Sequence, residues 1–136
     1  MNEQVQLELK KIFNGRFSTS VSTRNNYARG EDTFDPVLSK AVVFPETNSE
    51  VSKILKLCND HKIPVVPFGT GTSLEGNVVG NDKGITVSLE KMNKVLSVNV
   101  EDFDCRVQAC VTKEQLNEYL REDGVFFPID PGANAA

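Results

Sequence analysis

The chain has 136 residues, which is one domain's worth, and its 15 basic and 19 acidic side chains give a formal net charge of −4. Acids and bases are mixed without a basic patch, which disfavours nucleic-acid binding, and no apolar run approaches the ~20 residues of a membrane span. Because the first residues also lack the pattern of a signal peptide, we expect a cytoplasmic chain without a transmembrane segment or a nucleic-acid partner.

The N-terminal region is predicted to be a helix followed by a polar connector. Apolar residues recur at helical spacing over residues 3–13, and Gly15 ends the pattern. The stretch 16–35 is polar and irregular, with a short helical turn expected at 22–27, so a solvated connector is the default interpretation. We assign residues 1–38 to this N-terminal helix and connector.

A strand, a helix and a second strand are predicted next. Residues 40–44 are β-branched and apolar, and Thr47 and Glu50 have the spacing of a capping box that begins a helix. The apolar run 63–66 predicts a buried strand that breaks at Pro67. A helical crossover of this length implies that the two strands are parallel. One face of the helix is expected to be buried: Val51, Ile54, Leu55 and Cys58.

The second half of the chain alternates between apolar and polar residues, which is typical of strands. The predicted elements are a strand at 85–89, an antiparallel hairpin of strands at 96–100 and 105–111, a helix capped by Thr112, with Leu116, Tyr119 and Leu120 on its buried face, and ended by Gly124, and a last strand at 125–127. This order indicates the α+β class, with a small mixed sheet flanked by helices.

The three cysteines and the single histidine give no sign of a metal or redox site. Cys58, Cys105 and Cys110 are odd in number and form no C-x-x-C pair, so we expect reduced thiols and neither a zinc site nor a disulfide framework. His61 falls at the end of a predicted helix, where an exposed cationic side chain suits the helix dipole. No residue is assigned a catalytic role and none a metal.

The stretch between residues 67 and 77 is the candidate binding site. It carries three glycines and several hydroxyl side chains directly after an apolar strand. Successive backbone N–H groups in such a turn form a concave nest that binds anions, so we predict a cradle for a phosphate or pyrophosphate. The P-loop lysine is missing after Gly76, and Leu74 replaces the third glycine of a dinucleotide fingerprint. An ordinary glycine-rich surface loop is the alternative.

Four stretches, in this order, resemble the FAD-binding domain of the vanillyl-alcohol oxidase / p-cresol methylhydroxylase flavoprotein superfamily: Ala41–Thr47, Pro64–Gly76, Leu89–Leu96 and Phe127–Ala133. The branch of D-lactate dehydrogenases and glycolate oxidase FAD subunits looks closest. The resemblance implies that residues 39–136 are an FAD-binding subdomain of the p-cresol methylhydroxylase type, truncated before the second FAD subdomain and the substrate cap.

The resemblance also implies which residues contact the cofactor. Two segments match the family's FAD-binding positions: Pro67, Phe68, Gly69, Thr70, Gly71, Thr72, Ser73, Gly76 and Asn77 in the first, and Pro128, Ile129, Pro131, Gly132 and Ala133 in the second. Many members have glycine where this chain has Ser73 and Asn77. Some relatives attach FAD covalently through histidine, but His61 lies in no matching motif, so non-covalent FAD is expected.

The family chemistry implied is oxidation of a small D-2-hydroxy acid, such as D-lactate or glycolate, by hydride transfer to flavin N5. The substrate-binding and proton-accepting groups of the family lie beyond residue 136, so this fragment alone is expected to be inactive. Alkylglycerone-phosphate synthases and enolpyruvyl-sugar reductases use the same FAD fold, but the pairing of the two motifs disfavours them.

A different alternative is a free-standing, non-catalytic FAD-binding or interaction module. The partners expected for the fragment are FAD and the remainder of the FAD domain with its substrate cap. Half of an FAD cleft exposes apolar surface, so a homodimer through that surface is a further expectation.

Overall fold

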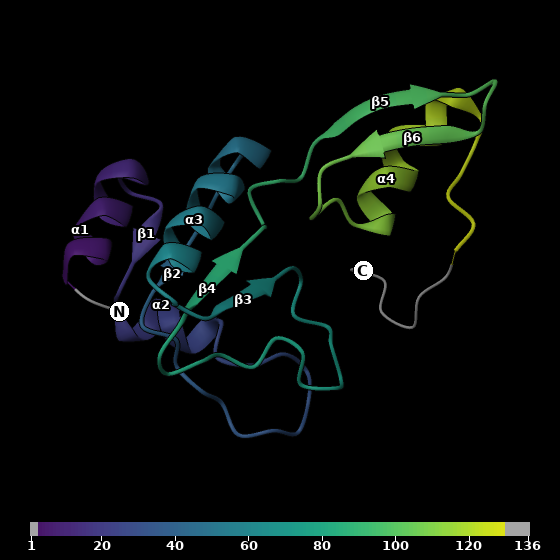
Figure 1. Cartoon of the computed structure of the whole chain (residues 1–136). Coiled ribbons are helices and arrows are strands. Elements are labelled where there is room, and N and C mark those ends of the chain that lie inside the picture. The colour runs from purple at the N-terminus through teal and green to yellow at the C-terminus, as the bar shows by residue number, and fades with distance from the viewer. Residues whose placement is uncertain (1–2, 130–136) are drawn as a thin grey trace.

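The computed structural model describes residues 3–129, and its elements carry the labels of Figure 1. They are α1 (Glu3–Ile12), β1 (Phe17–Ser18), α2 (Val21–Asn26), β2 (Val42–Val43), α3 (Asn48–Asp60), β3 (Val65–Phe68), β4 (Ile85–Ser88), β5 (Val95–Asn99), β6 (Asp104–Val107), α4 (Lys113–Leu120) and the 3-10 turn η1 (Arg121–Asp123). Figure 1 shows α1, α2 and α3 around a four-stranded sheet, with α4 beside the β5–β6 hairpin. This arrangement confirms the predicted α+β class and the mixed sheet.

The four-stranded sheet has the order β1-β2-β4-β3, with β2 and β3 both parallel to β4 and β1 antiparallel to β2. The parallel orientation predicted for the strands on either side of α3 is confirmed, although β4 lies between them. All four residues of β4 are buried because neighbours flank it on both sides. The buried hydroxyl of Thr86 in β4 donates a hydrogen bond to Ser39 Oγ, just before β2, at 2.8 Å.

The strand before the glycine-rich loop does not break at Pro67. β3 continues to Phe68, and Pro67 pairs in register with Val87 of β4. β3 lies at the edge of the sheet and has no neighbouring strand on its outer side. A proline is tolerated there because no strand on that side needs its missing N–H group. The expectation of a buried strand at 63–66 is also wrong, because Val65 and Val66 are only partly buried at this edge.

The main core lies between the sheet and the two longer N-terminal helices. It joins buried residues in or directly beside α1, β2, α3 and β4: Val5, Leu9, Phe13, Ala41, Val43, Ile54, Cys58, Ile85 and Val87. The predicted buried face of α3 is partly wrong. Leu55 is 47% exposed, and Leu57 packs against the core instead.

Thr47 caps the first turn of α3, but the Glu50 carboxylate bonds to the N–H of Glu46 in place of the N–H of Thr47, so the predicted capping box is incomplete. Thr47 Oγ1 accepts from the backbone N–H of Glu50 at 3.2 Å. The Glu50 carboxylate instead accepts from the N–H of Glu46 at 2.7 Å and from the guanidinium of Arg16 at 2.6 and 2.8 Å. This bidentate pair joins the N-terminal segment to α3.

The interpretation of residues 16–35 as a solvated connector is wrong, although the short helical turn expected at 22–27 is confirmed by α2. β1 pairs with β2, and α2 is a helix whose cap, Ser20, accepts from the N–H of Thr23. The ring of Tyr27 makes edge contacts with Phe44 and Phe68, at centroid distances of 5.6 and 5.0 Å. The N-terminal segment therefore packs on the sheet, while the domain boundary at residue 38 stays a prediction.

The predicted antiparallel hairpin is confirmed in β5 and β6, with an irregularity between Val95 and Ser97. This irregularity leaves Leu96 56% exposed. In α4, Leu116 and Leu120 are buried as expected, but Tyr119 is 56% exposed.

The expected strand at 125–127 is absent from the described chain. In its place, Asn117 of α4 accepts from the N–H of Phe127 at 2.7 Å. None of the helices within residues 3–129 is long and apolar enough to cross a membrane.

Candidate functional site

The glycine-rich loop leaves the end of β3 and returns to β4, and its glycines have distinct backbone roles. Gly71 and Gly76 have φ values of +79° and +72°, a conformation that costs side-chain-bearing residues energy. Gly69 has no such φ, and a Cβ built on it would meet no atom within 4 Å. Two glycines therefore shape the loop, and the third leaves open space at its surface.

The backbone amides of this loop are free to bind a ligand. Within residues 3–129, no N–H group from Gly69 to Val78 donates a hydrogen bond to a protein acceptor. Most loops of folded proteins satisfy their amides through turns or side chains, unless water or a ligand accepts from them. A run of unpaired N–H groups around two positive-φ glycines is the arrangement of an anion-binding nest.

Aromatic rings support the loop from beneath. Phe68 is only 6% exposed, and a Cβ on Gly71 would lie 2.8 Å from the tip of its ring. The ring of Tyr27 packs edge-on against the ring of Phe68, at a centroid distance of 5.0 Å. Phe68 was predicted to contact FAD, but its buried side chain serves the loop, so a contact with FAD stays a prediction.

A hollow of about 460 Å³ opens beside the loop. It is lined by Asn26, Tyr27, Phe68, Gly69, Thr70, Glu90, Asn93, Cys110, Thr112 and Gln115. Tyr27 donates a hydrogen bond of 2.5 Å to Oε2 of Glu90. Burial first, and then this hydrogen bond, raise the pKa of Tyr27 to about 12, so the phenol is neutral and remains a donor at physiological pH.

The predicted cofactor residues of the first segment lie together. Pro67 and Phe68 end β3, and the others follow in the loop: Gly69, Thr70, Gly71, Thr72, Ser73, Gly76 and Asn77. The hydroxyls of Thr70 and Thr72 are 3.3 Å apart, so these side chains meet at the loop surface.

The second predicted segment is only partly described. Pro128 lines a different hollow, beside the hairpin, and Ile129 is 62% exposed. Pro131, Gly132 and Ala133 lie outside the described residues. All the predicted cofactor contacts, in both segments, therefore stay predictions.

One segment that contacts the loop was not predicted from the sequence. Residues 28–37, called the strap below, lie against the loop through Gly30 and Phe34. Asp32, only 6% exposed, accepts from the N–H groups of Gly30 and Phe34 at 3.1 and 3.0 Å. A Gly-x-Asp pattern is typical of such side-chain-closed turns and was the available signal.

The cysteines are free thiols in different settings: Cys58 is buried, Cys110 partly buried and Cys105 exposed. Burial raises the pKa of the Cys58 thiol to about 11, and burial followed by the nearby Glu90 charge raises that of Cys110. Both thiols are thus protonated and poorly nucleophilic at neutral pH. Within residues 3–129, no three metal-binding side chains of His, Cys, Asp or Glu come together.

Comparison with known families decides the assignment. A family model described as an FAD binding domain matches residues 39–136. The chain belongs to this family of FAD-binding domains. The free amides and positive-φ glycines of the loop fit the pyrophosphate of FAD, because they offer donors without a Cβ in the way. The predicted cofactor is confirmed by the family.

Curated relatives agree with the branch inferred from the sequence. A Danio rerio protein named "Probable D-lactate dehydrogenase, mitochondrial" is 42% identical over 119 residues, covering 88% of this chain and 24% of its own length. An Arabidopsis thaliana protein named D-lactate dehydrogenase (cytochrome), mitochondrial, is 38% identical over 131 residues, covering 95% of this chain and 23% of its own length. The chain thus spans about a quarter of these oxidoreductases.

Solved structures confirm the fold. An alkyldihydroxyacetonephosphate synthase structure matches 99% of this chain and 27% of its own, with a TM-score of 0.89 and 19% identity. A p-cresol methylhydroxylase structure matches 91% of this chain and 26% of its own, with a TM-score of 0.73 and 20% identity. At such identities the likeness concerns the fold, and it confirms the predicted p-cresol methylhydroxylase type.

Proposed function

We propose that the chain is the FAD-binding part of an oxidoreductase that oxidises a small D-2-hydroxy acid of the D-lactate or glycolate type. The observation that carries the proposal is the run of unpaired amides from Gly69 to Val78, in a family of FAD-binding domains. The names of the relatives supply the substrate class. Bound FAD would supply the acceptor, flavin N5, for the hydride that leaves the substrate's α-carbon.

The chain's own residues bind and orient the cofactor. The loop amides donate to the dianionic pyrophosphate, whose charge needs no lysine when several preorganised N–H dipoles converge on it. The hydroxyls of Thr70 and Thr72 add donors at the same surface. Attachment is proposed to be non-covalent, and the substrate-binding and proton-accepting groups are proposed to lie outside this chain.

Titration of FAD with the purified chain, followed by flavin fluorescence, tests the cofactor site. Gly69→Val should weaken binding by about tenfold or more without unfolding the chain, because its added atoms enter the open space above the loop rather than the protein. Gln4→Val, at an exposed position of α1, is the matched control. Equal affinity of the Gly69→Val variant and the parent chain would place the ligand elsewhere.

The reaction class needs a second test. Turnover of D-lactate or glycolate with FAD and a dye acceptor should be absent from the chain alone and present when the remainder of the FAD domain and the cap are supplied. Turnover by the chain alone would overturn the assignment of the reacting groups to other parts of the protein.

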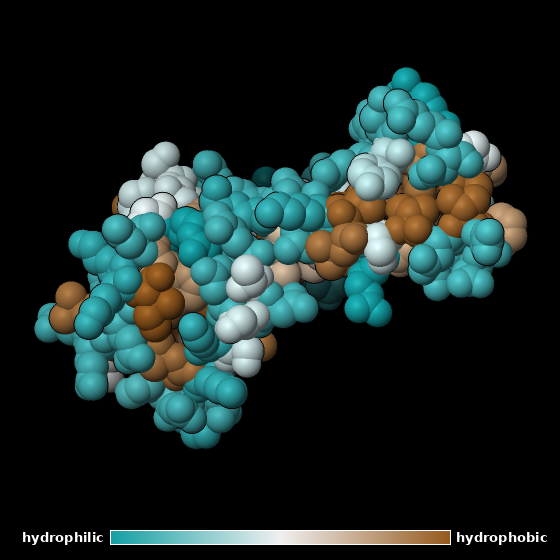
Figure 2. All heavy atoms as spheres, turned by 90° about the horizontal axis from the view of Figure 1, so that it is seen from above, coloured by the Kyte–Doolittle hydropathy of each residue, from teal (hydrophilic) through white to brown (hydrophobic). Residues whose placement is uncertain are grey.

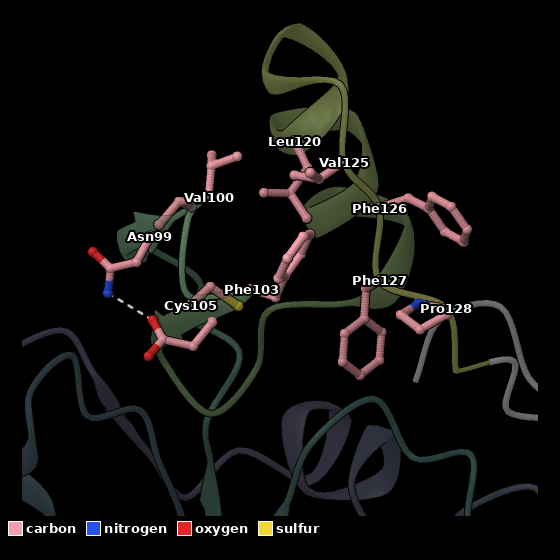
Figure 3. Close-up of a pocket in the computed structure, with 11 residues that line it drawn as sticks. Asn99, Val100, Phe103, Cys105, Leu120, Val125, Phe126, Phe127 and Pro128 are labelled. Atoms are coloured by element: carbon pink, nitrogen blue, oxygen red, sulfur yellow. Dashed lines mark hydrogen bonds between the residues drawn. The ribbon is translucent and has the colours of Figure 1, made fainter.

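An interaction role is the second candidate, because the hairpin side of the molecule carries an apolar hollow. Figure 2 shows a band of hydrophobic residues across the part that contains the hairpin and α4. In Figure 3, Phe103, Leu120 and Val125 point toward one another inside the hollow of about 410 Å³. We propose that the rest of the FAD domain, or in its absence a second copy of this chain, covers this surface.

The cellular location is proposed to be cytoplasmic, as the sequence composition suggested. The two relatives named above carry the word mitochondrial in their names. Fractionation of cells that express the tagged full-length protein separates the two locations, and recovery with mitochondria would overturn the proposal.

A further inference from the structure

The strap, residues 28–37, contacts the glycine-rich loop at several points, although the residues in contact are about 40 positions apart in the chain. Within the strap, the N–H of Glu31 donates to the carbonyl oxygen of Gly71 at 2.9 Å. Where the two ends of the strap meet, the carbonyl of Ala28 accepts from the N–H groups of Val37 and Gly80, at 3.2 and 2.9 Å. The second of these bonds fixes the point where the loop turns back toward β4.

Gly30 brings the strap backbone into direct contact with the loop. A Cβ built on Gly30 would lie 2.6 Å from the carbonyl oxygen of Gly71 and 2.9 Å from that of Ser73. Both carbonyls therefore face the strap. An anion cradle requires this orientation, because a carbonyl oxygen pointed at a phosphate repels it while an N–H attracts it.

Phe34 holds the far side of the loop. A Cβ on Gly76 would be 2.8 Å from two atoms of the Phe34 ring, so the ring lies flat on the glycine backbone. The ring is nevertheless 53% exposed and belongs to no core cluster. Asp32, buried within the strap, bonds the N–H groups of Gly30 and Phe34 and so sets the spacing of these two contacts.

We propose that the strap is a positioning device for the FAD site: it orders the loop with its carbonyls turned inward and its amides free, and Phe34 is the positioning residue. The inference rests on the proposed FAD site and goes beyond it, because it assigns part of the affinity to residues that need not touch the cofactor. A loop ordered before binding loses less conformational entropy when the ligand arrives.

The test compares Phe34→Ala with Phe34→Leu and with Phe126→Ala, a control that removes another exposed ring, 72% exposed, on the hairpin side of the molecule. Two readouts are taken on each chain: the FAD dissociation constant by flavin fluorescence, and NMR order parameters of the loop amides without ligand. Phe34→Ala should raise the dissociation constant about fivefold to tenfold and lower the order parameters at Gly71 and Gly76 below ~0.6.

Phe34→Leu should recover most of both properties, since a branched apolar side chain still covers Gly76, and Phe126→Ala should change neither. Weaker binding with an unchanged loop would mean that Phe34 touches the cofactor directly, which overturns the positioning role. A disordered loop with unchanged affinity overturns it as well. If the parent chain binds no FAD, the proposed function fails, and the order parameters alone then decide whether the strap orders the loop.

Discussion

Arg16 and Glu50 form the bidentate ion pair that fastens the N-terminal segment to α3. Their side chains are 23% and 21% exposed, so the pair is shielded from solvent more than a surface pair is. The hydrogen bonds from Arg16, helped by the N–H group of Glu46, lower the pKa of Glu50 from 4.5 to about 2. A partly buried hydrogen bond of 3.1 Å from Arg16 to the carbonyl of Phe44, next to β2, extends this connection to the sheet.

Because of this ion pair, we expect part of the free energy of unfolding to be lost in acid. Above pH 4.5 the Glu50 carboxyl is ionised in both folded and unfolded chains, so the contribution is complete; it is lost as the pH falls from 4.5 towards 2. We expect it to be about 1–2 kcal/mol after allowance for solvent screening. Urea unfolding between pH 2 and pH 7 measures it, and Glu50→Gln should lower stability at pH 7 and flatten the acid limb.

Lys11→Met provides the control for the loss of one charge, since Lys11 is an exposed residue at the end of α1. Its stability profile should run parallel to that of the parent chain. If the Glu50→Gln variant lost stability between pH 4.5 and pH 2 as steeply as the parent chain, the carboxylate responsible would be a residue other than Glu50.

At the scale of single elements, the end of α3 shows a residue in an unfavourable conformation. The N–H of Lys62 donates to the carbonyl of Asn59 at 3.2 Å, and the N–H of Ile63 to that of Cys58 at 2.8 Å. These are the two bonds of a Schellman motif, whose left-handed position is usually glycine. Here it is Lys62, with φ at +54°.

Lys62→Gly should therefore stabilise the chain by about 0.5–1 kcal/mol, because glycine adopts positive φ without the Cβ clash and the motif's bonds remain. Thermal or urea unfolding measures the difference. The matched control is Lys56→Gly, at an exposed position inside α3, which should cost about 1 kcal/mol. Destabilisation by both variants would mean that the lysine side chain itself holds the helix end.

The types of the elements could be predicted from the sequence, because periodicity and caps are local patterns. The burial of each element could not be predicted in this way. The helix that begins after Thr47 and the hairpin both follow from short-range patterns. By contrast, the burial of β4 depends on its insertion between β2 and β3, which only the folded topology determines. Pro67 misled the prediction for the same reason, since a proline is tolerated in a strand only when that strand lies at an edge.

At the scale of the whole molecule, the candidate site also has a part that the sequence predicts and a part that only the folded structure shows. The glycine-rich loop carries its own signal, because glycines and hydroxyls follow a strand. The strap and the ring of Tyr27 carry almost none, because their role arises from contacts with the loop and with Phe68 that are distant in sequence. The loop could thus be predicted from the sequence as a candidate site, whereas the segments that pack against it could not.

The apolar hollow beside the hairpin is the feature that concerns the molecule as a whole. Phe103, at the hairpin turn, is 86% exposed and has a φ of +53°, an uncommon conformation for an aromatic residue. A two-stranded hairpin is marginally stable by itself, and exposed aromatic residues beside an apolar hollow are typical of association sites. These properties favour an arrangement in which another protein surface covers the apolar hollow of the hairpin, over one in which the hollow is exposed to water.

We therefore expect the chain alone to dimerise through the hollow, with sedimentation velocity showing a shift from monomer to dimer as concentration rises. Phe103→Ser should weaken the dimer about tenfold, because truncation of a central aromatic anchor typically costs more than 1 kcal/mol. Leu7→Ser, which removes a 67% exposed apolar residue from α1, should leave the dimer unchanged. A parent chain that stays monomeric at all concentrations would exclude a second copy as the partner and leave the remainder of the FAD domain as the segment that covers the hairpin.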